Sequence, residues 1–355
     1  MGEKRLSVTM IRLPMIRALL LGLVLALPAT ASGAQEWLLN AGASHFYMQT
    51  AKANAIIEIH QFSGLEGSVS KEGDAEVKID LTSVASGIDV RDVRMRFLLF
   101  ETYKFPSAVV KAKIDMGKLQ QAASGTRITY PLAFSLDLHG MKQELEATVT
   151  VTRVGEKSVS VASAKPIVVS AEDFGLGPGI QKLSDAVNGT PIVRAVSITF
   201  DLVFETGEKI PEIQASYSEA AKRKKAEETG AISSQACETR FSVISTTGAI
   251  YFRTGSAELD TKSEPLLKSV ADIANRCPSV KIEITGHTDS VGSKDANQHL
   301  SAERAQSVAK YLVQQGVASP RIDTAGLGDT RPVAPNDSDA NRAKNRRIEF
   351  RVKGV

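Results

Sequence analysis

The chain is poor in aromatic residues and in cysteine, and each shortage excludes a class of protein. Aromatic residues form 5% of the 355 residues, and Trp37 is the single tryptophan. A membrane β-barrel needs aromatic girdles at both interfaces of the bilayer, so the composition argues against one. No apolar stretch after residue 34 is long enough for a transmembrane helix, and we expect none in the mature chain. The two cysteines have no histidine or cysteine partner at metal-binding spacing.

Excess positive charge is confined to the first residues. Residues 1–34 contain Lys4, Arg5, Arg12, Arg17 and Glu3, a net charge of +3 that equals the net charge of the whole chain. The remainder is therefore close to neutral and gives no electrostatic argument for a nucleic-acid partner. The basic residues precede an apolar run over 18–29 and small residues at 29–31. This order predicts a secretory signal peptide over residues 1–34.

The export signal decides how the cysteines are interpreted. An exported chain meets an oxidising compartment, where a pair of cysteines favours a disulfide. We therefore predict a bond between Cys237 and Cys277, which would close a loop of about forty residues. Two separate buried thiols are the alternative.

Residues 35–205 contain one alternating segment after another. Apolar and polar residues alternate over 76–81, 110–115, 132–138, 144–151 and 196–202, which is typical of an antiparallel sandwich or barrel. Most of these runs are shorter than a membrane-spanning strand. We therefore expect a barrel with charged residues in water and an apolar lumen, which is either a packed core or a ligand cavity. His60 falls on the polar face of its strand, and we expect it to be exposed.

Several short motifs in this region occur in the order found in one known family. They are residues 62–67 (FSGLEG), 81–84 (LTSV), Arg91-Asp92, Phe105-Pro106, Leu138-His139-Gly140 and Asp173-Phe174-Gly175. Residues 37 to about 204 thereby resemble the YceI family of secreted, lipocalin-like barrels. The resemblance implies a long apolar lipid of polyisoprenoid or quinone type in the lumen, with Phe134, Leu136, Ile198 and Phe200 as candidate contacts. Arg91 and Asp92 would fix their loop by capping and pairing, or contact a polar head group. His139 is interpreted as a turn residue.

Residues 206–240 differ in composition from the segments on either side. Alanine, glutamate, lysine and arginine dominate 211–228, and Gly230 suits a helix end. We predict a charged helical linker, in which the basic run 223–225 is a solvated face.

Residues 241–355 predict an α+β sandwich of a small sheet and two main helices. The expected order is a strand at 248–252, a helix at 261–276, a strand at 280–285, a helix at 297–315, a strand at 321–325 and a last strand at 348–352. The chain is therefore predicted to have two domains, an all-β antiparallel lipocalin-like barrel and a β-α-β-α-β-β sandwich over residues 241–355.

Asp289 and Arg304 are the residues of this sandwich best suited to a ligand. Asp289 lies just past a strand, and Arg304 lies two turns into the next helix. A carboxylate and a guanidinium in one cleft would suit a zwitterion, whereas a surface salt bridge between the two is the alternative.

The motif around these residues resembles the peptidoglycan-associating domain of the OmpA family. The shared pattern is Gly286-His287-Thr288-Asp289, then Asn297, Leu300, Ser301, Arg304, Ala305 and Val308. The resemblance implies that the diaminopimelate of peptidoglycan is bound, with Asp289 on its ammonium and Arg304 on its carboxylate. Asn297 and Arg346 would line the same cleft beside Thr288.

These expectations describe a binding protein that is not an enzyme and needs no cofactor or metal, apart from a possible bound isoprenoid lipid. No activated nucleophile is found beside a base. We expect it in the periplasm of a Gram-negative bacterium, associated with the cell wall or outer membrane, with peptidoglycan and an apolar lipid as partners. An outer-membrane structural protein, with residues 35–205 as an embedded barrel, is the alternative.

Overall fold

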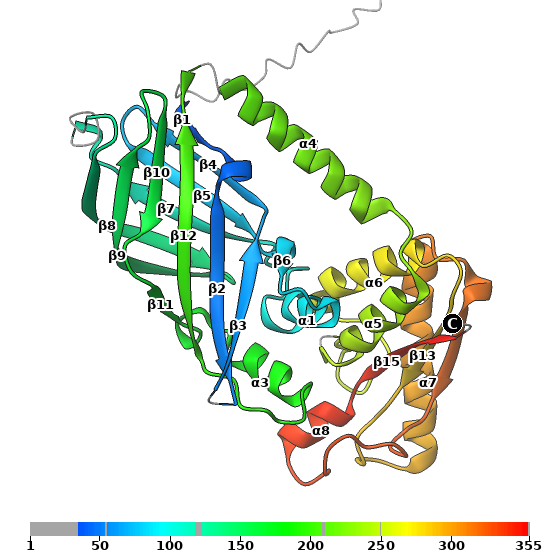
Figure 1. Ribbon diagram of the computed structural model, residues 1–355. Helices are drawn as coiled ribbons and strands as arrows, with labels where there is room; N and C mark the ends of the chain where they lie inside the picture. The colour runs from blue at the N-terminus through cyan, green and yellow to red at the C-terminus, as the bar shows by residue number, and fades with distance from the viewer. Residues whose placement is uncertain (1–34, 54, 118–122, 208–209, 249, 354–355) are drawn as a thin grey trace, which may run out of the picture. The chain divides into compact units, whose positions relative to one another are not determined.

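The computed structural model describes residues 35–353 except 54, 118–122, 208–209 and 249 (Figure 1). The predicted signal peptide lies outside these residues. Within the described ranges, every helix is too short or too polar to cross a membrane.

The N-terminal domain is a β-barrel in which all paired strands are antiparallel. Its strands are β1 (Gln35–Leu39), β2 (His45–Lys52), β3 (Ile56–Phe62), β4 (Leu65–Ser70), β5 (Asp74–Asp80), β6 (Val84–Ala85), β7 (Ser107–Lys113), β8 (Arg127–Leu138), β9 (Met141–Arg153), β10 (Ser158–Ser163), β11 (Ile167–Ser170) and β12 (Ala195–Glu205). Its helices are α1 (Asp89–Arg94), which continues as a π-helical turn over Met95–Leu99, and α3 (Gly177–Asp185).

Pairing of β1 with both β4 and β12 closes the barrel. In the described residues, eight strands form a ring in the order β1, β4, β5, β7, β8, β9, β10 and β12. The strands β2, β3 and β6 continue the sheet from β12, and β11 also pairs with β12. Of the antiparallel sandwich or barrel that the alternating segments predicted, the barrel is present, and the lipocalin-like form that the YceI resemblance implied is confirmed.

The helix α4 (Ile210–Thr229) follows the barrel and falls in the charged segment that was predicted to be helical. At 1.5 Å per residue its twenty residues span about 30 Å. The next helix, α5 (Ser234–Ser245), begins at an N-cap serine, Ser233, whose side chain accepts a hydrogen bond from the backbone N–H of Ala236. The predicted boundary at residue 240 thus falls within α5.

The C-terminal domain is a three-stranded sheet with helices packed against it. The sheet order is β14 (Ile322–Gly326), β13 (Lys281–Gly286) and β15 (Ile348–Lys353), with β14 parallel and β15 antiparallel to β13. The remaining helices are α6 (Glu264–Arg276), α7 (Lys294–Gln314) and α8 (Asp339–Asn345). The α+β class is confirmed, but the expected strand at 248–252 is not a regular strand. Of the described residues in that segment, Phe252 forms an isolated bridge with Leu259.

The core of this domain is formed by the apolar faces of three helices and the sheet. Phe241 of α5, Leu267 of α6, Ile282 of β13 and Val308 of α7 are completely or almost completely buried in one cluster. Burying a side chain of this size stabilises a fold by roughly 1.5–3 kcal/mol. Helical and strand spacing predicted the elements that carry Leu267, Ile282 and Val308, whereas α5, which carries Phe241, was not predicted.

Two glycines allow α7 to approach the ends of β13 and β14. A Cβ atom on Gly286 would lie 2.0 Å from the carbonyl oxygen of Ser301, and one on Gly326 would lie 2.4 Å from the backbone nitrogen of Ala302. Both contacts involve backbone atoms, which a side-chain rotation cannot relieve. The close approach places residues of α7 directly beside the loop that follows β13.

The predicted disulfide between Cys237 and Cys277 is present. It joins α5 to the C-cap residue of α6, with 6.1 Å between the two Cα atoms. Both cysteines are fully buried in the C-terminal core. The bond therefore fixes the first helix of this domain to the end of the second.

Removing this disulfide should destabilise the C-terminal domain. We expect the Cys237→Ala/Cys277→Ala double variant to lose about 2–4 kcal/mol, because the unfolded chain regains the freedom of a long closed loop. Urea unfolding of the full chain measures the loss. Dithiothreitol should lower the urea midpoint of the wild type to about that of the double variant. It should leave the midpoint of the double variant unchanged. Equal midpoints for oxidised wild type and double variant would contradict the prediction.

Candidate functional site

Five residues from three separate segments line one cleft in the C-terminal domain. Thr288 and Asp289 come from the loop after β13, Asn297 and Arg304 from α7, and Arg346 from the segment between α8 and β15. These are the five residues that the sequence singled out. Their arrangement depends on the glycine contacts described above, which bring α7 against the end of β13.

Asp289 is almost fully buried, and three hydrogen bonds hold it in place, two at its side chain and one at its backbone. Its Oδ2 accepts a hydrogen bond from Arg346 at 2.6 Å, and its Oδ1 accepts one from the backbone N–H of Val291 at 3.0 Å. Asn297 donates from Nδ2 to the backbone carbonyl oxygen of Asp289 at 3.2 Å. A carboxylate offers about four lone-pair sites, so Asp289 keeps acceptor capacity for a ligand.

Arg304 does not pair with Asp289, contrary to the simple salt-bridge alternative. Its Nε donates to the backbone carbonyl oxygen of Ser256 at 3.0 Å, and its guanidinium lies 5.0 Å from the ring centroid of Phe252. Burial lowers the pKa of Arg304 from its ordinary value, the charge of Arg346 adds to this effect, and Asp289 opposes it. The guanidinium is thus a desolvated, oriented cation, which is suited to bidentate binding of a carboxylate.

Thr288 contributes a buried hydroxyl to the same cleft. Its Oγ1 has no hydrogen-bond partner among the described residues, while its backbone N–H donates to the carbonyl oxygen of Gly328 at 2.9 Å. A buried polar atom left without a partner is destabilising unless a water or ligand satisfies it. The hydroxyl is therefore an available contact for a bound molecule.

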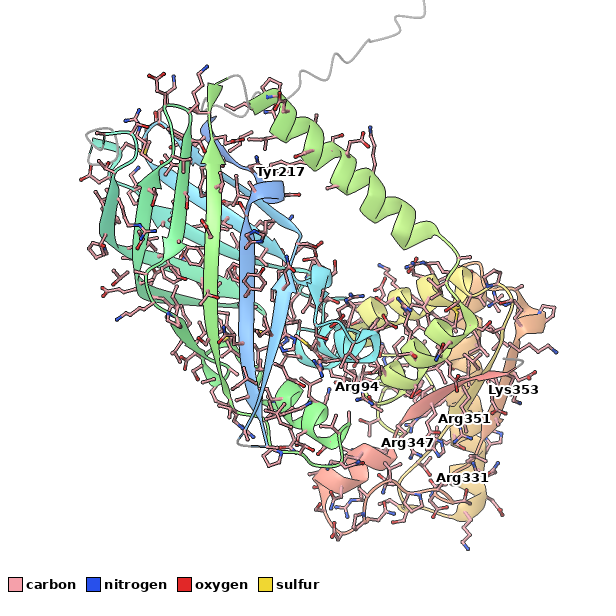
Figure 2. All side chains as sticks on the ribbon, viewed as in Figure 1. Arg94, Tyr217, Arg331, Arg347, Arg351 and Lys353 are labelled. Atoms are coloured by element: carbon pink, nitrogen blue, oxygen red, sulfur yellow. A yellow bond between two sulfur atoms is a disulfide. The ribbon has the colours of Figure 1, made fainter. Side chains whose placement is uncertain are left out.

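The lining of the same cleft also includes a charged network around Glu349. Its Oε1 lies 3.6 Å from Nε2 of His287 and accepts a hydrogen bond from Nε of Arg347 at 2.8 Å. Arg347 and Arg351 flank Glu349 in the chain (Figure 2). The His287 imidazole and the Arg347 guanidinium lower the pKa of Glu349 to about 2. His287 is buried behind the motif and does not line the cleft, so its place in the motif is structural.

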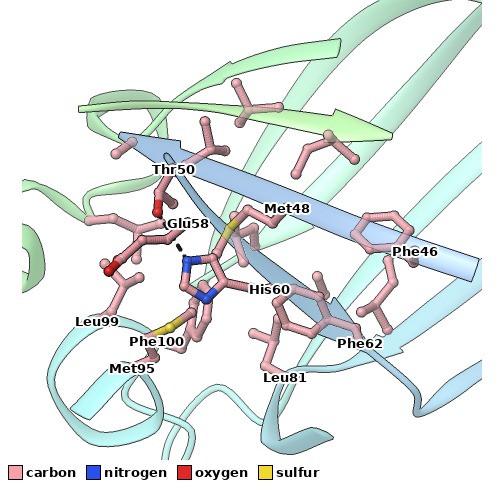
Figure 3. Close-up of a pocket in the computed structure, with 18 of the residues that line it drawn as sticks. Phe46, Met48, Thr50, Glu58, His60, Phe62, Leu81, Met95, Leu99 and Phe100 are labelled. Carbon is pink, nitrogen blue, oxygen red and sulfur yellow. Dashed lines mark hydrogen bonds between the residues drawn. The ribbon is translucent and has the colours of Figure 1, made fainter. Parts of the chain in front are cut away.

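The second candidate site is the lumen of the barrel, which holds a cavity of about 340 Å³ (Figure 3). The four residues predicted to contact a lipid, Phe134, Leu136, Ile198 and Phe200, all line it. Phe46 stacks on Phe200 with 6.4 Å between their ring centroids. The lumen is therefore a cavity with apolar walls rather than a fully packed core.

The expectation that His60 is exposed is wrong. His60 is 2% exposed and lines the cavity, whereas Ile57 and Ile59, which precede it on the same strand, are 63% and 56% exposed. The usual alternation is inverted on β3, because the strand points Glu58, His60 and Phe62 inward. The partner strand could have revealed this, since Met48 of β2 lies opposite His60 and both line the lumen.

Arg91 and Asp92 fix their loop by pairing, as part of one of the two interpretations expected, but neither side chain caps the start of α1. Asp92 accepts a hydrogen bond from the backbone N–H of Ser86 at 2.8 Å, and Arg91 forms an ion pair with Glu58 at 2.8 Å. Arg91 also lines the cavity. His139 occupies the turn between β8 and β9 with a positive φ of 56°, in agreement with its interpretation as a turn residue.

Comparisons with protein-family models match the two domains separately. Residues 37–204 match the YceI-like domain, and residues 251–346 match the OmpA family. The second match includes all five residues of the cleft.

Individual proteins are similar to one domain or the other. The peptidoglycan-binding protein ArfA of Mycobacterium tuberculosis is 45% identical over 107 residues, which cover 30% of this chain and 33% of that protein. Outer membrane porin F of Pseudomonas fluorescens is 46% identical over 86 residues, covering 24% and 26%. The chain thus spans about a third or less of the length of these relatives. A polyisoprenoid-binding domain from Saccharophagus degradans is 32% identical, with a TM-score of 0.48, and the match covers 49% of this chain and 99% of that structure.

Proposed function

We infer that this chain is a non-enzymatic binding protein of the bacterial cell envelope. It combines a YceI-like domain, residues 37–204, with an OmpA-family domain, residues 251–346. Its C-terminal domain tethers to peptidoglycan, and its barrel holds an apolar lipid such as a polyisoprenoid or quinone. It acts in the periplasm, next to the cell wall or outer membrane of a Gram-negative bacterium.

The observation that carries the tether is the meeting of opposite charges in one cleft. Asp289 and Arg304, each 8% exposed, line it together with the buried hydroxyl of Thr288. Diaminopimelate carries an ammonium and a carboxylate on one side chain. Asp289 receives the ammonium, Arg304 receives the carboxylate, and Asn297 and Arg346 hold Asp289 in place. Each charge-assisted hydrogen bond contributes about 1.5–3 kcal/mol, so the tether is reversible.

The apolar walls of the lumen support lipid binding. The cavity of about 340 Å³ falls in the size range of small-molecule pockets. An apolar chain that enters it leaves water, and each buried CH₂ group contributes roughly 0.8 kcal/mol.

An embedded outer-membrane barrel is disfavoured by the outer face of the strands. Lys111 and Glu76 form an exposed ion pair there, and so do Lys142 and Glu144. A charged side chain facing lipid at the bilayer midplane costs roughly 2–4 kcal/mol. Fractionation distinguishes the two functions, because an embedded barrel would leave the envelope only with detergent.

A pull-down on purified peptidoglycan tests the tether. We expect Asp289→Asn and Arg304→Lys to weaken binding by roughly tenfold each. The first removes the negative charge that accepts the ammonium, and the second removes the paired N–H donors that bind a carboxylate. Asp323→Asn and Arg331→Lys make the same chemical changes at exposed positions outside the cleft and should bind as the wild type does. Full binding by both cleft variants would overturn the tether.

Native mass spectrometry of protein purified from membrane-rich extracts tests the lipid, and an empty barrel in every preparation would overturn that half of the proposal.

A further inference from the structure

The wall of the lumen changes from charged to aromatic along β2. The strand lines the cavity with Lys52, Thr50, Met48 and Phe46 in that order. These inward positions cover about 20 Å at the usual rise of a strand. One end of the lumen is therefore polar, and the other is apolar.

The neighbouring strand β3 repeats this gradient. Glu58, His60 and Phe62 line the cavity, and Glu58 lies opposite Thr50 while His60 lies opposite Met48. Because both strands change from charged to aromatic in the same direction, the gradient extends across the cavity wall that they form. A molecule that is polar at one end and apolar at the other therefore has a single favourable orientation in it.

His60 lies where the polar and apolar parts of this wall meet. Its Nε2 shares a hydrogen bond with Oγ1 of Thr50 at 3.0 Å, drawn as the dashed line in Figure 3. Its Nδ1 is buried and has no hydrogen-bond partner among the described residues. Met48, Phe62 and Phe100 line the cavity around it (Figure 3). The unpartnered nitrogen thus offers one hydrogen bond to a molecule inside the lumen.

Three charged residues beyond His60 are paired with one another, namely Lys52, Glu58 and Arg91, whereas Arg94, which also lines the cavity, forms no ion pair with a described residue. Glu58 forms ion pairs with both Lys52 and Arg91. The carboxylate thus serves two cations, and its Arg91 contact measures 2.8 Å. Burial lowers the pKa of His60, and the nearby cations add to this effect although Glu58 and Asp92 oppose it. The lowered pKa favours the neutral imidazole, which can form a hydrogen bond with an uncharged group.

From this arrangement we infer that the lumen selects amphiphiles with a small uncharged head group. The head group, a hydroxyl, carbonyl or amide, makes a hydrogen bond with Nδ1 of His60, and the apolar tail extends toward Phe46 and Phe200. Nδ1 acts as donor or acceptor according to the tautomer that the hydrogen bond with Thr50 selects. Thr50 is a positioning residue, because it fixes the ring. This inference rests on the proposed lipid-binding function and adds the head-group class and the orientation.

A head-group series on one isoprenoid skeleton tests the inference. The delipidated full chain is given farnesol, farnesoic acid, farnesylamine and the hydrocarbon farnesane in one mixed detergent micelle, and native mass spectrometry measures the bound fractions. Farnesol can make a hydrogen bond with the buried Nδ1, whereas farnesane leaves that nitrogen without a partner. We therefore expect a preference of roughly five- to tenfold for farnesol over farnesane. The acid and the amine should bind less than farnesol.

Variants separate the hydrogen bond from simple packing. His60→Leu should bring the farnesol-to-farnesane ratio close to one without reducing farnesane binding. Thr50→Val should reduce the ratio in part. Met48→Leu is the matched control in the same wall and should keep the wild-type ratio, because it removes no hydrogen bond.

Three other outcomes would contradict the role of His60, the uncharged head group or the lipid function. Equal binding of farnesol and farnesane by the wild type, or a preference that survives in His60→Leu, would overturn the role of His60. Tighter binding of farnesoic acid, lost in Arg91→Ala, would place an anionic head group at the ion pairs instead. Binding of none of the four compounds would overturn the proposed lipid function itself, together with this inference.

Discussion

Alanine in place of Gly286 should unfold much of the C-terminal domain. The added Cβ would lie 2.0 Å from the carbonyl oxygen of Ser301, far closer than a carbon and an oxygen that are not bonded can approach. Because the obstructing atom belongs to the backbone of α7, the helix must move away from β13. We expect a loss of about 3 kcal/mol or more, at the upper end of the effects of overpacking.

Hydrogen exchange of the full chain measures where this loss occurs. Protection should fall in β13 and α7 and remain at wild-type levels in the barrel strands. Gly155→Ala is the control, because a Cβ at that position would meet nothing within 4 Å. Wild-type protection of α7 in Gly286→Ala would show that the strand and helix do not approach as closely as described. Peptidoglycan binding should fall together with protection, because α7 carries Asn297 and Arg304.

A bulky side chain directed into the lumen should empty the barrel of its ligand. Ala108 is buried and lines the cavity from β7. The cavity of about 340 Å³ leaves room for an indole ring, so Ala108→Trp should fold and occupy the ligand's space. We expect bound lipid to fall by roughly tenfold or more, since the loss of only about 1.4 kcal/mol of binding free energy gives a factor of ten.

The same substitution on the outer face provides the control. Ala133 of β8 is exposed and does not line the cavity, so Ala133→Trp should keep its lipid. Native mass spectrometry compares the two variants after purification from the same membranes. Peptidoglycan pull-down should be unchanged in both, because the cleft lies in another domain. Undiminished lipid in Ala108→Trp would mean that the bound molecule lies outside the lumen.

The sequence predicted the residues of the polar cleft but not their pairing. The strand, turn and helix around Asp289 are local features, and their hydrophobic periods are clear. Arg346 is 57 residues away from Asp289 in the chain, and only the folded domain shows that it, rather than Arg304, forms the ion pair. The role of Ser256 as acceptor for Arg304 is equally non-local, because a backbone carbonyl leaves no trace in a sequence pattern.

The barrel was predictable where its strands alternate in the ordinary way. Phe134, Leu136, Ile198 and Phe200 were assigned to the lumen because each strand has a single apolar face. The rule failed at β3, where isoleucines face outward and His60 faces inward. Alternation identifies two faces but does not state which is inside, and a polar cavity wall reverses the usual assignment. Local rules are expected to fail at functional or strained sites, which agrees with the proposed role of this wall in lipid binding.

The disulfide also determines how the C-terminal domain responds to mechanical force. A load from the barrel side reaches this domain through the start of α5, and Cys237 is the fourth residue of that helix. Only the first turn can be pulled straight before the covalent bond transmits the force to Cys277 at the end of α6. The chain between the two cysteines, which are 40 positions apart and joined by about 140 Å of extended chain, stays out of the force path. In the proposed tether to peptidoglycan, the disulfide therefore limits how far α5 can be extended before the force reaches α6.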